Sequence, residues 1–372
     1  MRFSSLVLKN LLRRPLRSGL TLLALTTAVA SVVSLRGIAR GFTASFAGVY
    51  ESHSVDIVVS RQGTADRLSS SVSEGLIQPL REIAGVAKVD GVLLETLSLE
   101  DQQIFGIPTM GIARDSWLRE DYRWSASNAT TSPRQVSLGV HLAERAGVAV
   151  GDSLEFFEEP YEVAGIFESS SAWENGSMMM PLEQLQALVD RGDQVTYINV
   201  VLGSGVDADQ ANEIIEQIQA VDGRLHALAT DDFVGTDTRM QIAGAMAWMT
   251  SLIALVIGGI GTLNTMMTSV LERTREIGIL RAIGWPQKRV FKLIVAEALL
   301  LAITASALGC FFAVAATAMM SQHPAIRGIL APEIEISTAA EGTVLAVLIG
   351  LIGAILPASR AARVSPTEAI RG

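Results

Sequence analysis

Four long apolar segments constrain this 372-residue chain more than any other feature. They are Leu16–Leu35, Ile242–Val270, Leu293–Met320 and Thr343–Ala358. An α-helix needs about 20 apolar residues to cross about 30 Å of hydrocarbon, and the first three segments reach that length. The fourth is shorter and ends near Pro357, but it contains no charged residue. We therefore expect four transmembrane helices, which the hydrophobic content of 49% supports.

The stretch between the first two segments, residues 41–239, is mostly polar and long enough to form a folded domain. Runs rich in β-branched residues at Val55–Ser60 and Thr196–Leu202 predict strands. Asp207–Val221 predicts a capped amphipathic helix. Strand–helix–strand patterns at both ends of the stretch favour one α/β lobe next to the membrane.

The middle of this domain has a different pattern. A short helix is expected at Val140–Ala146, followed by strands around Ser153–Phe157 and Tyr161–Phe167. Met178–Met180 favours a core strand over a soft-metal site, and Pro181 fits the first turn of the next helix. These elements predict a β-rich lobe inserted into the first. The expected fold class is an α-helical membrane protein with four transmembrane helices and an extracytoplasmic α+β domain.

Basic residues predict the orientation of the spans. The segment before the first span, the loop after the second and the C-terminal tail are rich in Arg and Lys, and short segments of this kind stay in the cytoplasm. Both termini are therefore expected inside and residues 41–239 outside. The residues expected to anchor the chain at the inner membrane face are Arg13, Arg14, Arg17, Arg360 and Arg363.

These patterns divide the chain into nine expected parts. In chain order they are an amphipathic helix (1–15), a span (16–40), the outer domain (41–239), a span (240–270), a charged cytoplasmic helix (271–290), a span (291–320), an outer loop (321–340), a span (341–359) and a cytoplasmic tail (360–372). The basic N-terminus and Ala28–Ala30 also resemble a cleavable signal peptide. The apolar run continues to Leu35, which favours a retained anchor.

The charge is unevenly distributed. Residues 41–239 hold 12 Lys and Arg against 31 Asp and Glu, a net charge of −19, whereas the whole chain has −9. An acidic outer domain argues against nucleic acid as a partner. It favours either cationic partners or simple solubility.

Residue types that carry chemistry are sparse. None of the four His residues has the spacing of a metal site, so we expect no metal and no catalytic residue. Cys310, the single Cys, excludes an intramolecular disulfide. Glu297 lies about one turn into the third span, where an ion pair with Lys292 or Arg289 is expected. The sequence contains no G-x-x-x-x-G-K-[ST] motif, so any ATP would be bound by another chain.

Small residues recur in the second span at Ala254, Gly258 and Thr262. Four-residue spacing of this kind lets helices approach closely. Two interpretations remain open, a contact between subunits and packing within one helix bundle.

The charged segment "LERTREIGILRAIGWPQKRV" (Leu271–Val290) combines an apolar stripe with charges of both signs. Gly284 fits the end of a helix, and Trp285 fits the membrane–water interface. Retention in the cytoplasm would explain the bases but not the stripe. An apolar ridge ringed by charges indicates a short helix that docks into a groove on a protein.

This segment resembles the cytoplasmic coupling helix of ABC transporter permeases of the MacB/LolC/FtsX superfamily. The tail "PASRAARVSPTEAIRG" (Pro357–Gly372), the N-terminal "LVLKNLLRRPLRSGLTLLAL" and "VSLGVHLAERAGVAVGDSLEF" in the outer domain are similar to the same family. The order of one span, a large outer domain and three further spans also matches. The likeness is strong in the coupling segment and tail, and weaker in the outer domain.

The resemblance implies roles and partners. The chain would be a stand-alone permease that pairs with an identical or related permease and docks on a separate ABC ATP-binding subunit, which would hold ATP and Mg²⁺. Membrane lipids and a periplasmic adaptor protein are further expected partners, in a bacterial inner membrane. Ile277 and Leu280 would form an apolar dock. The full set of coupling residues is Glu272, Arg273, Arg275, Glu276, Ile277, Leu280, Arg281, Ile283 and Gly284.

The function implied is the transfer of motion from the ATPase to the outer domain. Export or extraction of a lipophilic, lipoprotein or peptide substrate is favoured over the alternative, transmission of a signal that controls a periplasmic enzyme such as a cell-wall hydrolase. The chain itself is expected to be non-catalytic.

Overall fold

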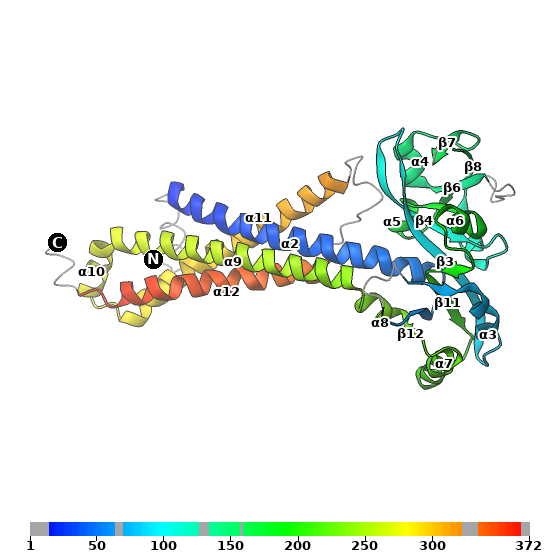
Figure 1. Ribbon diagram of the computed structural model, residues 1–372. Coiled ribbons are helices and arrows are strands. Elements are labelled where there is room, and N and C mark those ends of the chain that lie inside the picture. The colour runs from blue at the N-terminus through cyan, green and yellow to red at the C-terminus, as the bar shows by residue number, and fades with distance from the viewer. Residues whose placement is uncertain (1–14, 64–69, 126–133, 157–158, 322–333, 366–372) are drawn as a thin grey trace. The chain divides into compact units, whose positions relative to one another are not determined.

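The structure is a computed structural model that describes residues 15–63, 70–125, 134–156, 159–321 and 334–365 (Figure 1). The chain divides into two compact units. The helical unit comprises residues 1–40, 243–320 and 332–372, and the sheet unit comprises residues 41–242 and 321–331, each as far as it is described.

Within the described residues, four helices are long and apolar enough to cross a membrane. They are α2 (Pro15–Ser52), α9 (Thr238–Glu272), α11 (Gln287–Ser321) and α12 (Ile336–Ala362). Each extends beyond the apolar segment expected for it. The hydrogen bonds of a helix are made by the backbone, so a helix can continue through polar residues on either side of the apolar segment. The short α10 (Thr274–Ala282) lies between α9 and α11 in the chain. Together with the sheet described below, these helices confirm the expected fold class.

The long helices pack through small residues. A Cβ added to Gly258 of α9 would lie 3.1 Å from the Cβ of Ala28 on α2. One added to Gly309 of α11 would lie 2.7 Å from the Cβ of Val29. Cβ atoms do not normally approach so closely, so both positions need glycine, which has no Cβ. Glycine therefore lets α9 and α11 pack closely against α2, and Figure 1 shows α9 and α12 running alongside it.

The sheet unit contains one large mixed sheet, whose strand order is β12-β1-β11-β3-β4-β9-β6-β8-β5 with β7 paired to β8. β2 and β10 form a separate pair. The strands are β1 (Ile57–Arg61), β2 (Val72–Ser73), β3 (Val86–Leu99), β4 (Ile104–Ile112), β5 (Arg123–Trp124), β6 (Gln135–Gly139), β7 (Ser153–Phe156), β8 (Glu159–Glu168), β9 (Met178–Pro181), β10 (Gln194–Val195), β11 (Tyr197–Leu202) and β12 (Leu225–Ala229).

Short helices cover this sheet. They are η2 (Glu74–Leu76), α3 (Ile77–Arg81), η3 (Trp117–Glu120), α4 (Val140–Ala146), α5 (Ala172–Asn175), α6 (Leu182–Leu188), α7 (Ala208–Val221) and α8 (Thr230–Gly235). The helix expected from Asp207 is α7. Its N-terminus is a capping box, in which the Asp207 carboxylate accepts from the Gln210 N–H and the Gln210 amide oxygen accepts from the Asp207 N–H.

The strands are buried on both faces, which explains why they read as continuous apolar runs. Ile57 and Val59 belong to one core, whereas Val58, between them, belongs to the other. Met178 and Met180 pack into the first core and Met179 into the second. The Met run is therefore a core strand, as the sequence predicted.

The two expected lobes share this single sheet. β4 pairs in parallel with β9, with Thr109 opposite Met178 and Ile112 opposite Pro181. This pairing joins strands from the two ends of the domain to strands from its middle. Because the bonds join residues about 70 positions apart, no local pattern could predict them.

Candidate functional site

The segment between α9 and α11 folds into a short helix with defined ends. Arg273 is the N-cap residue of α10, and Gly284 follows its C-terminus with φ of 98°. The Gly284 N–H donates to the Arg281 carbonyl and the Trp285 N–H to the Leu280 carbonyl, each at 3.1 Å. These two bonds form a Schellman motif, whose left-handed residue is usually Gly. Gly284 therefore ends the helix as predicted.

One side of α10 is buried within the helical unit. Ile277 is only 1% exposed and packs in a cluster with Val290 of α11 and Ala358 of α12. The assignment of Ile277 to an apolar docking surface is therefore wrong, because its side chain fills the space between helices. Its role is to fix α10 in place.

The exposed surface of the segment is formed by other residues. Ile279 is 49% exposed and Ile283 is 71% exposed, whereas Leu280 and Arg281 are half-buried. Glu272, Arg275 and Glu276 are exposed charged residues near the start of the segment, and Lys288 and Arg289 are exposed near its end. The exposed surface of α10 and its C-terminal end thus contains an apolar pair, Ile279 and Ile283, beside charges of both signs.

A buried ion pair ties the start of α10 to α11. The Arg273 Nη1 lies 3.1 Å from Oε1 and 3.0 Å from Oε2 of Glu297, and the two residues are 8% and 2% exposed. The base that pairs with Glu297 here is Arg273, whereas the sequence suggested Arg289 or Lys292. Lys292 precedes Glu297 by five residues, which places it about 140° away around the same helix. Arg273 is likewise too buried to belong to an exposed polar ring.

Two further bases contact Trp285. The Arg281 Nη1 donates to the Trp285 carbonyl at 3.0 Å. The Arg289 guanidinium lies 4.4 Å from the centre of the Trp285 ring, within the range of a cation–π contact. These contacts stabilise the turn between α10 and α11.

The expected anchoring residues are only partly described. Arg13 and Arg14 lie outside the described residues, as does the side chain of Arg17, whose backbone belongs to α2. Arg360 lies in the last turn of α12, with Nη1 3.7 Å from the sulfur of Met267, and Arg363 is the C-cap residue.

The small residues of α9 pack within the chain. Gly258 and Thr262 are buried, and Ala254 is half-buried. Thr262 faces α12, where a Cβ added to Gly353 would lie 3.3 Å from it. Of the two open interpretations, the structure shows packing within one helix bundle for Gly258 and Thr262.

One ion cluster in the helical unit was not predicted. Arg40 of α2 donates to Glu341 of α12 at 2.8 Å and to the Thr338 hydroxyl at 2.6 Å, and Arg36 also pairs with Glu341. Arg36 and Arg40 lie four residues apart and so share a face of α2. That spacing was the available signal, but nothing local identifies Glu341, about 300 residues later.

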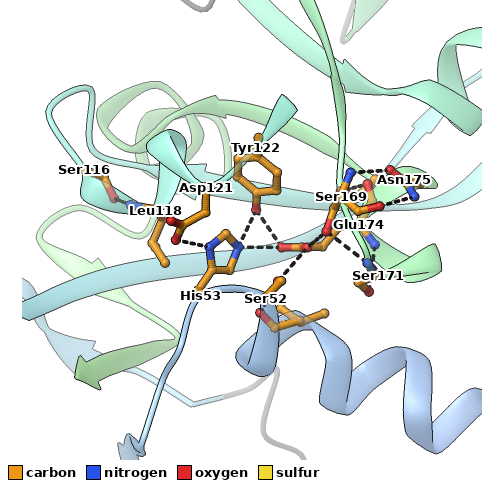
Figure 2. A network of polar contacts seen from close by, with 12 residues as sticks. Ser52, His53, Ser116, Leu118, Asp121, Tyr122, Ser169, Ser171, Glu174 and Asn175 are labelled. Atoms are coloured by element: carbon orange, nitrogen blue, oxygen red, sulfur yellow. Dashed lines mark hydrogen bonds and ion pairs between the residues drawn. The ribbon is translucent and has the colours of Figure 1, made fainter. Parts of the chain in front are cut away.

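A second unpredicted network lies in the sheet unit, at the end of α2 (Figure 2). His53 Nδ1 lies 2.9 Å from Asp121 Oδ2, and Nε2 lies 3.0 Å from Glu174 Oε1. The Tyr122 hydroxyl donates to Glu174 Oε1 at 2.6 Å. The hydroxyls of Ser169 and Ser52 donate to the other Glu174 oxygen. The network thus joins α2, the residues after η3, and α5.

The network favours a charged imidazole. Both His53 nitrogens face carboxylate oxygens, so the imidazolium can donate to both. Burial lowers the pKa of His53, but hydrogen bonds and charges from Glu174 and Asp121 outweigh it and raise the pKa above 6.5. Burial and the Glu174 carboxylate raise the pKa of Tyr122 well above its usual value, so this hydroxyl remains a donor.

The centre of this network is buried, whereas Asp121 at its edge is exposed. His53 is 5% exposed and Glu174 0%. Across the described residues, no group of three or more His, Cys, Asp or Glu side chains could hold a metal ion.

Comparison with known proteins gives two family matches. Residues 18–218 match the MacB-like periplasmic core domain, and residues 248–366 match the C-terminal part of FtsX-like permeases. The first match covers more than half of the chain and the second covers α10.

Individual relatives agree with these matches. The macrolide export ATP-binding/permease protein MacB of Nitrobacter winogradskyi is 26% identical over 96% of this chain, which spans 58% of that protein's length. An uncharacterized ABC transporter permease of Bacillus subtilis, YknZ, is 22% identical, with 98% of both chains covered. The periplasmic region of MacB from Actinobacillus actinomycetemcomitans is a structural neighbour, with 14% identity, a TM-score of 0.39, and coverage of 50% of this chain and 94% of that one. With its multi-pass helices and both family matches, the chain belongs to the MacB-like and FtsX-like permeases of ABC transporters.

Proposed function

We propose that this permease docks α10 on a separate ATP-binding subunit and passes the motion driven by ATP hydrolysis to the sheet unit. The observation that carries the proposal is the two-sided character of α10. Ile277 and the Arg273–Glu297 pair fix its buried side, whereas Ile279 and Ile283 remain exposed beside charges. A helix held this firmly transfers a push to its neighbours instead of yielding to it.

The surrounding arrangement follows from family membership and charge. Two permeases, identical or related, would assemble with ATPase subunits in a bacterial inner membrane. Both termini and α10 would lie in the cytoplasm, where Arg360 and Arg363 meet anionic headgroups. The sheet unit would lie outside, where an adaptor protein could contact it. ATP and Mg²⁺ would bind the ATPase, since this sequence has no P-loop motif.

The process served is export or extraction of a lipophilic, lipoprotein or peptide substrate. One relative is named for macrolide export, and macrolides combine an apolar body with polar groups. A sheet unit with a net charge of about −19 over residues 41–239 is suited to contact with water and with cationic partners.

The test is to purify the chain gently from its native membrane and identify its companions by mass spectrometry. A stoichiometric ATP-binding subunit is expected, together with its loss in Ile283→Asp and its retention in Ser98→Asp, an exposed change in the sheet unit. Absence of any ATP-binding subunit, even with trapped nucleotide, would overturn the proposal. A bound ATPase accompanied by a cell-wall hydrolase, with no substrate-stimulated activity, would replace export by signal transmission.

A further inference from the structure

The sheet unit contains a cavity with an aromatic lining. The chain has only 5 Trp, 4 Tyr and 11 Phe residues, and six of these meet around one cavity of about 100 Å³. The six are Phe42, Phe46, Tyr50, Trp173, Tyr197 and Phe233. Aromatic side chains from four separate elements, α2, α5, β11 and α8, therefore converge on one space.

The rings support one another edge to face. The Tyr50 ring lies 5.8 Å from Phe46, 6.0 Å from Tyr197 and 5.6 Å from Phe233. Phe46 in turn lies 6.3 Å from Trp173, with the ring planes at 89°. Such contacts hold each ring in one orientation. The cavity is consequently largely pre-formed, as ligand sites usually are.

The size of the cavity limits what it can hold. An engineered protein cavity of about 150 Å³ with apolar walls binds benzene. A space of about 100 Å³ that opens at one side accommodates a single six-membered ring or a branched alkyl group. A whole drug-sized molecule would have to leave most of its surface outside.

Charges at the rim are balanced. The rim includes Glu95, Asp237 and Arg239. Glu95 pairs with the guanidinium of Arg191 at 2.7 Å, and the Asp237 carboxylate accepts the Arg239 backbone N–H at 2.8 Å. Arg191 does not itself line the cavity, but when it is counted with its partner Glu95, the two acids are matched by two bases. A neutral ligand group is favoured over an ion, because an ion would need a counter-charge.

We propose that this cavity binds an uncharged ring or branched alkyl group of the transported substrate. The inference rests on the proposed function, and it specifies the substrate as an amphipathic molecule that carries such a group. Two walls come from the end of α2 and from Met240 at the start of α9, helices whose remaining residues belong to the helical unit. A bound group therefore contacts both chain segments that lead to the spans.

The test uses the full chain in lipid nanodiscs and a small uncharged probe, 3-ethyl-3-methyldiazirine, a branched alkyl group of the size that the cavity admits. After photolysis, labelled residues are identified by mass spectrometry. We expect saturable label on Phe46, Trp173 or Phe233. The occluding variant is Thr96→Trp, an exposed rim position on β3, and its matched control is Ser98→Trp, exposed two residues further along β3 and outside the lining.

Thr96→Trp should reduce the label on the lining about tenfold, because the indole occupies the space of the probe. Ser98→Trp should leave it unchanged. Lining residues without label, or label that Thr96→Trp does not reduce, would overturn the inference. Thr96 and Ser98 are both exposed, and unchanged thermal unfolding in each variant confirms that folding is intact.

The same variants separate this inference from the proposed function. Co-purification of the ATP-binding subunit tests the proposed function and does not involve the cavity. If the ATPase binds but the cavity takes no label, only the cavity inference fails. If the cavity is labelled but no ATPase ever associates, the cavity still binds apolar groups, and its assignment to a transported substrate fails.

Discussion

The guanidinium of Arg273 lies within 3.1 Å of both carboxylate oxygens of Glu297, so the residue before α10 is tied to α11. Removing one member of a buried ion pair leaves the other charge in a poorly solvated site. We expect Glu297→Gln to lower the free energy of unfolding in detergent by about 3 kcal/mol and to weaken ATPase co-purification.

The double variant Arg273→Met with Glu297→Met should recover most of this loss, because no charge remains buried. Glu276→Gln is the matched control. Glu276 also pairs with Arg273, with Oε2 3.7 Å from Nε, but its side chain is exposed. It should cost less than about 1 kcal/mol. Equal losses for Glu297→Gln and Glu276→Gln would contradict the importance of the buried pair.

Two isoleucines of the coupling segment should separate docking from folding. Ile283 is 71% exposed and Ile277 only 1%. Ile283→Asp should abolish co-purification of the ATP-binding subunit while leaving thermal unfolding nearly unchanged. Ile277→Ala should lower the free energy of unfolding by about 2–4 kcal/mol, because it opens a cavity between α10, α11 and α12. The reverse pattern, with Ile283→Asp unstable and ATPase binding retained, would show that the docking surface lies elsewhere.

The His53 network should make the stability of the sheet unit depend on pH. The groups that face His53 are Asp121 and Tyr122 from the residues after η3, Glu174 from α5 and the ring of Trp117, and Ser52, the last residue of α2, donates to Glu174. The pKa of His53 is raised above 6.5 in the folded state. Its contribution is therefore fully present below the unfolded pKa of 6.5 and is lost as pH rises through the folded value.

The change to test is His53→Gln, with thermal unfolding of the full chain measured from acid to alkaline pH. The variant should be less stable than the parent by about 3 kcal/mol at pH values below 6.5, and the difference should shrink at high pH. His226→Gln, at an exposed position, is the control and should leave the profile unchanged. A difference between parent and His53→Gln that grows with pH would show that the imidazole is buried neutral.

Gly309 should be intolerant of any side chain. A Cβ there would lie 2.7 Å from Val29 and 3.0 Å from the Thr26 carbonyl oxygen, so α2 and α11 would have to separate. We expect Gly309→Ala to destabilise the helical unit by about 1–3 kcal/mol, measured by thermal unfolding in detergent. Gly244→Ala on α9 meets nothing within 4 Å and should be neutral or slightly stabilising. Similar behaviour of the two variants would exclude close α2–α11 packing.

Local patterns predicted much of the fold. Val140–Ala146 forms a helix with the expected bounds, and Gly284 ends α10, because capping and periodicity act within a few residues. The pairing of β4 with β9 and of His53 with Glu174 involves residues 69 or more positions apart in the chain, and a single sequence carries no local signal for such contacts. The fold class was therefore predictable from the sequence, whereas these long-range contacts between its elements were not.

The candidate site shows the same division. A coupling segment was identifiable from its charges, its apolar residues and its resemblance to a family. Which apolar residues face outward was not, because α10 has Ile277 and Leu280 toward one side and Ile279 and Ile283 toward another. Only the packing of α10 against α11 and α12 determines which pair is buried.

Trp173 and Glu174 are consecutive residues of α5, a helix of a single turn. One lines the aromatic cavity, and the other accepts hydrogen bonds from His53 and Tyr122. A shift of so short a helix moves both side chains together. By thermodynamic reciprocity, a substrate group that alters proton binding at His53 must itself bind with an affinity that depends on pH, by the same factor. Protons would then act as a second ligand of the sheet unit, coupled to the cavity through two adjacent residues.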